Sequence, residues 1–82
     1  MNKITVYTKP NCAACEMTKK FLRENNIPFE SIDVTQDEEA LNAIKQAGYT
    51  GVPVVTIGDG FDVSWHGFRP DELERIAGHG FQ

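Results

Sequence analysis

The only two cysteines of the chain, Cys12 and Cys15, lie three residues apart and begin a segment with helical spacing. Residues at this separation share one face of a helix, so the two thiols can reach each other and store two electrons as a disulfide. The free N–H groups and the positive dipole end at a helix N-terminus favour the thiolate of the first cysteine. The pattern predicts thiol–disulfide exchange, with Cys12 as the nucleophile and Cys15, one turn deeper, as the thiol that resolves the mixed disulfide.

The composition of the 82 residues supports a redox role for this pair. We expect one domain over residues 1–82, in which a disulfide between residues three apart closes too short a loop to stabilise the fold much. A net charge of −4 without a basic patch argues against nucleic acid as a partner, and no apolar run is long enough to span a membrane. No signal segment precedes the first strand, so we expect a cytoplasmic protein. We also expect it to be a monomer. In the cytosol, paired cysteines are more often catalytic or metal-binding than structural.

Hydrophobic periodicity and turn residues predict the element order β-α-β-α-β-β-α. We expect strands over residues 3–8, 29–34, 52–57 and 61–65. Helices are expected over 12–25, from a capping box at 35–38 to 48, and from 70 to a stop at Gly78-His79-Gly80. With the cysteine pair between the first strand and the first helix, this order matches an α/β thioredoxin-like fold of the glutaredoxin type. Such a fold has a four-stranded mixed sheet flanked by three helices.

The ends and faces of these helices are also predicted. Asn11 is the expected cap of the first helix, Gly48 a left-handed cap of the second, and Pro70 the first residue of the third. The inward face of the first helix is expected to contain Cys15, Met17, Phe21 and Leu22.

A metal site is the first alternative for the cysteines. His66 and His79 could join them around zinc, but twelve residues separate the two histidines, whereas zinc sites usually have three to five. An iron–sulfur module would need a dimer or glutathione to complete the ligands of one pair. We therefore expect no metal ligand, and place His66 on the surface or in a groove.

Pro53 lies at the start of the strand predicted over residues 52–57, where proline cannot donate to the ladder. The residues alone are equally consistent with an ordinary turn proline. In a thioredoxin-like fold, this proline is cis and faces the cysteine pair. The backbone of Val52 is then free to pair with an incoming chain as an added strand.

The segment 64–71 places aromatic residues beside an arginine in a glycine-containing corner. Trp65 and Phe68 could be core residues, but aromatic residues beside an arginine are typical of partner surfaces. For Arg69, partner docking and a structural hydrogen-bond network are both open. Together with Lys9, which adds positive charge near the first cysteine, the predicted docking set is Lys9, Val52, Pro53, Trp65, His66, Phe68 and Arg69.

Three segments, residues 7–15, 51–55 and 64–71, resemble the NrdH-redoxin family over nearly the whole chain. The resemblance implies a glutaredoxin-like protein with thioredoxin-like activity and no cofactor besides its redox pair, Cys12 and Cys15. It implies electron transfer to class Ib ribonucleotide reductase and re-reduction by thioredoxin reductase, ultimately from NADPH. It also implies that Pro53 is the cis-proline, and that Trp65 and Arg69 belong to a network tying the last strand to the last helix.

Two positions depart from this family pattern. Ala13 and Ala14 stand where the family usually has Val-Gln or Met-Gln, which removes a polar group beside the disulfide and is expected to alter the redox potential. His66 stands where serine is usual, and its imidazole is expected to alter partner contacts or to add a pH-sensitive group.

The nearest alternative function is a glutathione-dependent glutaredoxin acting as a general disulfide reductase. That family usually has Pro-Tyr between its cysteines and a Gly-Gly-x-Asp-like segment, which residues 58–62 do not match. A metal or iron–sulfur module and a pure protein-interaction module are the alternatives from other classes. The interaction module would be indifferent to Cys12→Ser.

Overall fold

The computed structural model describes the backbone of residues 3–79 and the side chains of residues 3–77. The elements follow the predicted order: β1 (Ile4–Thr8), α1 (Ala13–Glu24), β2 (Glu30–Asp33), α2 (Glu38–Gln46), β3 (Val54–Ile57), β4 (Val63–His66) and α3 (Pro70–His79). Each strand is one or two residues shorter than predicted, and β4 starts two residues later and ends one residue later than predicted. The third helix extends to His79, within the Gly78-His79-Gly80 segment that is predicted to end it.

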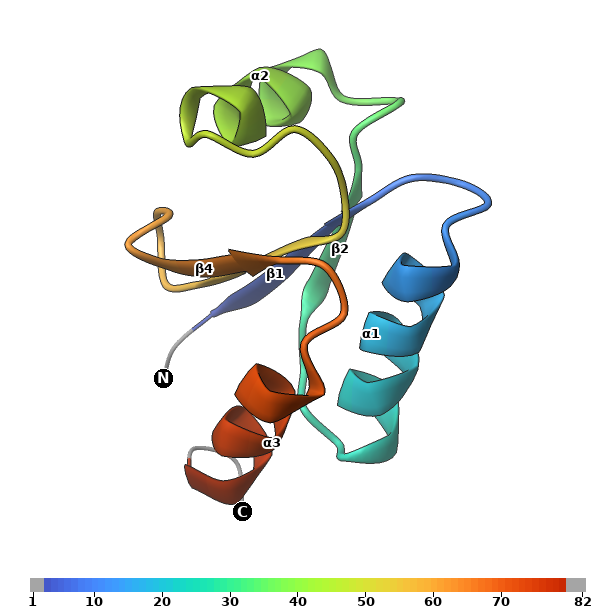
Figure 1. Cartoon of the computed structure of the whole chain (residues 1–82), viewed down its shortest axis with the longest axis vertical. Helices are drawn as coiled ribbons and strands as arrows, with labels where there is room; N and C mark the ends of the chain where they lie inside the picture. The colour runs from blue at the N-terminus through green and yellow to red at the C-terminus, as the bar shows by residue number, and fades with distance from the viewer. Residues whose placement is uncertain (1–2, 80–82) are drawn as a thin grey trace.

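The four strands form one mixed sheet in the order β2-β1-β3-β4. β1 pairs parallel with β2 and antiparallel with β3, which in turn pairs antiparallel with β4. The two central strands consist largely of β-branched residues, which pack well on a pleated surface. The arrangement confirms the predicted thioredoxin-like fold, with α1 and α3 on one side of the sheet and α2 on the other (Figure 1).

A separate hydrophobic core lies on each face of the sheet, because side chains alternate along a strand. Val55 packs in one core with Leu22 of α1 and Leu73 of α3, whereas its neighbour Val54 packs in the other with Ile44 of α2. Helices on both faces therefore hold β1 and β3 in the middle of the molecule, and the loop after β1 and the loop before β3 carry the candidate site.

The start of α1 differs from the prediction. Cys12, and not Asn11, is the N-cap residue, and Asn11 adopts a left-handed conformation with φ of 59°. The prediction for Met17 is also wrong, because its side chain is 50% exposed. The buried stripe contains Thr18 in its place, between Cys15 and Leu22, at the i, i+3, i+7 spacing of one helix face.

The other predicted helix ends are largely confirmed. Gly48 has a φ of +97° and follows the C-cap of α2, and α3 begins at Pro70. The cap of α2 is Asp37 and not the predicted Thr35: the backbone N–H of Ala40 donates to the Asp37 carboxylate at 3.0 Å. Because a carboxylate is favoured at the positive end of a helix, Asp37 fixes the first turn of α2.

Candidate redox site

Cys12 and Cys15 form a disulfide across the first turn of α1. Their Cα atoms are 5.2 Å apart, within the usual range for bridged cysteines. The two residues differ in access to solvent, because Cys12 is partly exposed and Cys15 is completely buried. A large partner can therefore approach only the sulfur of Cys12.

The backbone of α1 is directed at the sulfur of Cys12. As the N-cap residue, Cys12 accepts a hydrogen bond on Sγ from the backbone N–H of Cys15 at 3.2 Å. The only acidic side chain in this first turn, Glu16, is paired with Lys19 at 2.9 Å. A hydrogen-bond donor and the positive end of the helix thus face the atom that carries the charge in a thiolate.

The loop before β3 lies against the same sulfur. The carbonyl oxygen of Val52 is 3.9 Å from Cys12 Sγ. The peptide bond between Val52 and Pro53 is cis, as the fold and the family resemblance implied, and Pro53 is fully buried. The backbone N–H of Gly67 donates to the Pro53 carbonyl at 2.8 Å, so a hydrogen bond joins the corner after β4 to this loop.

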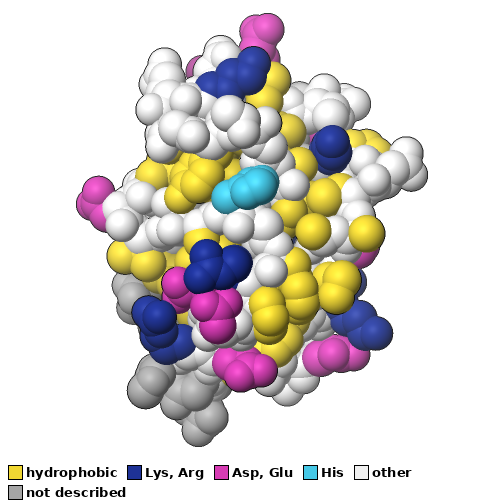
Figure 2. Space-filling model, viewed as in Figure 1, with side chains coloured by type: hydrophobic (Ala, Val, Ile, Leu, Met, Phe, Trp, Pro, Cys, Tyr) yellow, Lys and Arg dark blue, Asp and Glu magenta, His cyan; other side chains and the backbone are white. Residues whose placement is uncertain are grey.

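His66 is exposed at the end of β4 and pairs in register with Val54. A Cβ atom built on Gly51 would lie 3.4 Å from its Nε2, so the imidazole lies against the loop that carries Val52. Figure 2 shows an exposed histidine with hydrophobic side chains on either side of it on one face of the molecule. A partner chain that lies along this loop would meet His66.

Trp65 is a core residue and not a surface aromatic. It is 7% exposed and packs in the core shared with α1 and α3, with the partly buried Phe68 against the same cluster. Among the described residues, none accepts a hydrogen bond from its indole N–H. This burial favours a structural role for Trp65 over the docking role.

Arg69 pairs within its own corner. Its guanidinium donates to both carboxylate oxygens of Asp71, at 3.1 and 2.9 Å, and lies 3.8 Å from Glu72. This bidentate pair raises the pKa of Arg69 and lowers the pKa of Asp71. The expected network between Trp65 and Arg69 does not form through their side chains in the described part of the chain. The backbone of Arg69 takes part in the start of α3, because its carbonyl oxygen accepts a hydrogen bond from the N–H of Leu73 at 3.0 Å.

Comparisons with known proteins agree with this geometry. The family model for glutaredoxin matches residues 4–61. The glutaredoxin-like protein NrdH of Escherichia coli K12 is 39% identical over 74 residues, which cover 90% of this chain and 88% of that protein. NrdH of Lactococcus lactis IL1403 is 38% identical over 74 residues, covering 90% and 99%. The chain belongs to the NrdH-redoxin family.

The solved structure of the NrdH-redoxin from Escherichia coli supports the same assignment. It is described as a glutaredoxin-like protein with a thioredoxin-like activity profile, and it superposes on this redoxin with a TM-score of 0.83. The match covers 90% of this chain and 93% of that one at 39% identity. This redoxin is therefore a glutaredoxin-like redox protein whose C-x-x-C cysteines lie at disulfide distance.

The described part of this redoxin offers neither a metal centre nor a membrane-spanning helix. Within it, no group of three or more His, Cys, Asp or Glu side chains is placed to hold a metal ion, and the side chain of His79 lies outside the described residues. None of the helices described between residues 3 and 79 is both long enough and apolar enough to cross a membrane.

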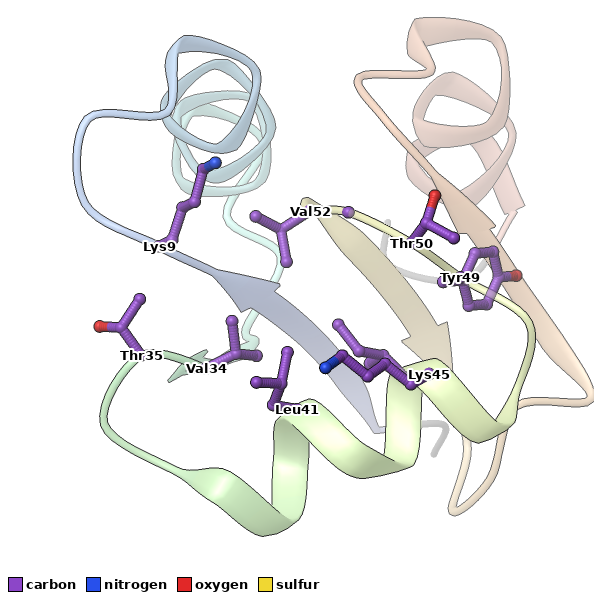
Figure 3. A pocket seen from close by; sticks show the side chains of 10 residues that line it. Lys9, Val34, Thr35, Leu41, Lys45, Tyr49, Thr50 and Val52 are labelled. Carbon is purple, nitrogen blue, oxygen red and sulfur yellow. The ribbon is translucent and has the colours of Figure 1, made fainter.

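Sequence reasoning missed one feature next to the redox pair. Lys9 is exposed on the loop after β1, as its predicted docking role requires, and lines a cavity together with Val52. The opposite wall comes from α2 and includes Leu41 and Lys45 (Figure 3). No local motif marks this wall, because only the packing of α2 against the sheet brings it near residues 9 and 52.

Proposed function

We propose that this redoxin is a dithiol electron carrier that reduces class Ib ribonucleotide reductase and is re-reduced by thioredoxin reductase. It would act as a single cytoplasmic domain and a monomer, with no cofactor besides its cysteine pair. The observation that carries the redox part is the accessible sulfur of Cys12, which caps α1 beside a completely buried Cys15. The choice of client and reductase rests on the family resemblance of the segments around residues 7–15, 51–55 and 64–71.

In the proposed cycle, the Cys12 thiolate attacks one sulfur of the client disulfide. The client S–S bond breaks, and its second sulfur leaves and takes up a proton. The Cys15 thiolate then attacks the Cys12 sulfur of the mixed disulfide, which forms the Cys12–Cys15 disulfide and releases the first client sulfur as a thiol. The client gains two electrons and two protons, and thioredoxin reductase returns two electrons from NADPH to the redoxin.

The assignment of roles follows from access and hydrogen bonding. Cys12 is the only one of the two sulfurs that an outside disulfide can approach, and the N–H of Cys15 at 3.2 Å supports its thiolate. Cys15 lies one turn along α1, behind the first sulfur, where it can reach a mixed disulfide but not a free client. The backbone of Val52, 3.9 Å from Cys12 Sγ, supports docking of the client as an extended strand.

A trapping experiment tests these roles. With a disulfide-containing client in excess, Cys15→Ser should accumulate a mixed disulfide through Cys12, seen as a covalent adduct by non-reducing electrophoresis and mass spectrometry. Cys12→Ser should form none, because Cys15 is buried. Equal trapping by both variants would refute the distinction between the two cysteines, and trapping only by Cys12→Ser would reverse their roles.

A paired assay tests the reductase, because the glutaredoxin family match keeps glutathione as the second candidate. NADPH oxidation is followed with thioredoxin reductase, and separately with glutathione and glutathione reductase, using the same client. We expect efficient turnover with thioredoxin reductase. If turnover is efficient only in the assay with glutathione and glutathione reductase, the protein is a glutathione-dependent glutaredoxin and the proposed function is wrong.

A further inference from the structure

A cavity of about 260 Å³ opens beside the redox pair, between the loop after β1 and the sheet-facing side of α2. Its apolar lining includes Val34, Leu41 and Ile44, and its two charged lining residues are Lys9 and Lys45. Figure 3 shows these two lysines on different sides of the cavity, one from the loop and one from the helix. The volume is below the usual range for small-molecule sites, so it suits a side chain better than a whole cofactor.

The position of the cavity ties it to the reaction. Val52 lines the cavity, and its carbonyl oxygen is 3.9 Å from Cys12 Sγ. A client strand that pairs with the Val52 backbone, with its reacting cysteine at Cys12, must pass the mouth of the cavity. Because an extended chain advances about 3.3 Å per residue, a side chain within two or three residues of the client cysteine reaches it.

The charge around the cavity is positive in a chain whose net charge is −4. Lys9 and Lys45 are exposed, and neither forms an ion pair among the described residues. No carboxylate lines the cavity. Asp37 and Glu38 line a more open hollow that adjoins it. The Asp37 carboxylate accepts the N–H at the start of α2, and Glu38 lies in the first turn of the same helix, where the positive end of the helix dipole favours its charge. Two ammonium groups without partners thus flank an apolar floor.

We propose that this cavity binds an acidic side chain of the client polypeptide, within three residues of the client's reacting cysteine. The carboxylate pairs with Lys9 and Lys45, and the aliphatic part of the side chain lies on Leu41. The inference rests on the proposed carrier function and adds a client preference to it: disulfides flanked by Glu or Asp react faster than those flanked by neutral residues.

The test uses two synthetic peptides with the same internal disulfide, which differ only by Glu or Gln two residues from the reacting cysteine. The pre-reduced redoxin is mixed with each peptide, and the rate of peptide reduction is measured by quenched-flow chromatography. The same rates with dithiothreitol correct for the intrinsic reactivity of the two disulfides. We expect the corrected rate for the Glu peptide to be about two- to five-fold higher, as one or two exposed ion pairs provide.

Substitution of the cavity lysines locates the preference. Lys45→Gln and Lys9→Gln should each lower the Glu-to-Gln rate ratio, and the double variant should bring it to one. Lys20→Gln removes the same charge from the exposed face of α1, outside the cavity, and should keep the wild-type ratio. The wild-type ratio should also fall as ionic strength rises.

The outcomes separate this inference from the proposed function. If both peptides are reduced at equal corrected rates, the acidic preference is refuted while disulfide reduction stands. If neither peptide is reduced, the carrier function itself fails. A ratio that survives in the double variant overturns the assignment to the cavity. S-methylglutathione, added at the same concentration as the peptide, tests a free tripeptide as a competing ligand. If it brings the Glu-to-Gln rate ratio to one, the cavity binds the free tripeptide, and the proposal of a polypeptide ligand is overturned.

Discussion

Leu22 and Met17 provide a direct test of how α1 packs. Both are large apolar residues on the helix that carries the cysteine pair, but Leu22 is 0% exposed and Met17 is 50% exposed. Replacing each by alanine therefore removes a similar side chain from two very different environments. Leu22→Ala leaves a cavity in the core formed with Ile4, Val6 and Leu73, whereas Met17→Ala shortens a side chain that already meets water.

The magnitudes of the two effects follow from this burial. A completely buried leucine replaced by alanine costs about 3–5 kcal/mol, the sum of lost transfer free energy and the cavity left behind. A domain of this length has a free energy of unfolding of roughly 4–12 kcal/mol, so the loss is a large fraction of it. At about 4–8 °C per kcal/mol, the Tm falls by roughly 12 °C or more. Met17→Ala should cost less than about 1 kcal/mol.

The assay is urea unfolding of the oxidised protein, followed by tryptophan fluorescence and extrapolated linearly to water. Trp65 is the only tryptophan and packs in the same core as Leu22, so its emission reports loss of that core. A loss below about 1 kcal/mol for Leu22→Ala, or equal losses in the two variants, would refute the packing described for α1. It would favour the inward Met17 that helical periodicity alone predicts.

Three further changes test smaller parts of the structure. Asp37→Ala removes the N-cap of α2 and should lower the free energy of unfolding by about 0.5–2 kcal/mol in the same urea assay; an unchanged value contradicts the cap. Arg69 lowers the pKa of Asp71 from its usual 3.8, so this pair stabilises the fold above about pH 4 and loses its effect as the pH falls through the lowered pKa. Urea unfolding between pH 2 and 7 should therefore show a weaker acid dependence for Asp71→Asn than for wild type; identical profiles refute the coupling. Tyr49→Phe removes the 2.6 Å hydrogen bond to Ser64 and should cost about 0.5–1.5 kcal/mol, whereas in a Ser64→Ala background the same change should cost less.

Much of the fold was predictable because its signals are local. β-branched strands, apolar residues at helical spacing, Gly48 and Pro70 each depend on a few neighbouring residues, and together they predict the correct order of seven elements. The errors also have local causes. The sequence offers several polar residues before each helix, and only the folded backbone shows that Cys12 and Asp37 are the caps. Met17 and Thr18 are adjacent, and a rotation of about 100° decides which one is buried.

The candidate site divides in the same way. The spacing of Cys12 and Cys15 by itself determined the thiol–disulfide chemistry, because residues three apart meet within one helical turn. Only the tertiary structure decided that Val52, forty residues away, lies beside the first sulfur, and that α2 closes a cavity next to it. It also decided that Trp65 is a core residue. These contacts join distant segments through the packing of helices on both faces of the sheet, and no local pattern of residue types encodes which side chains that packing exposes.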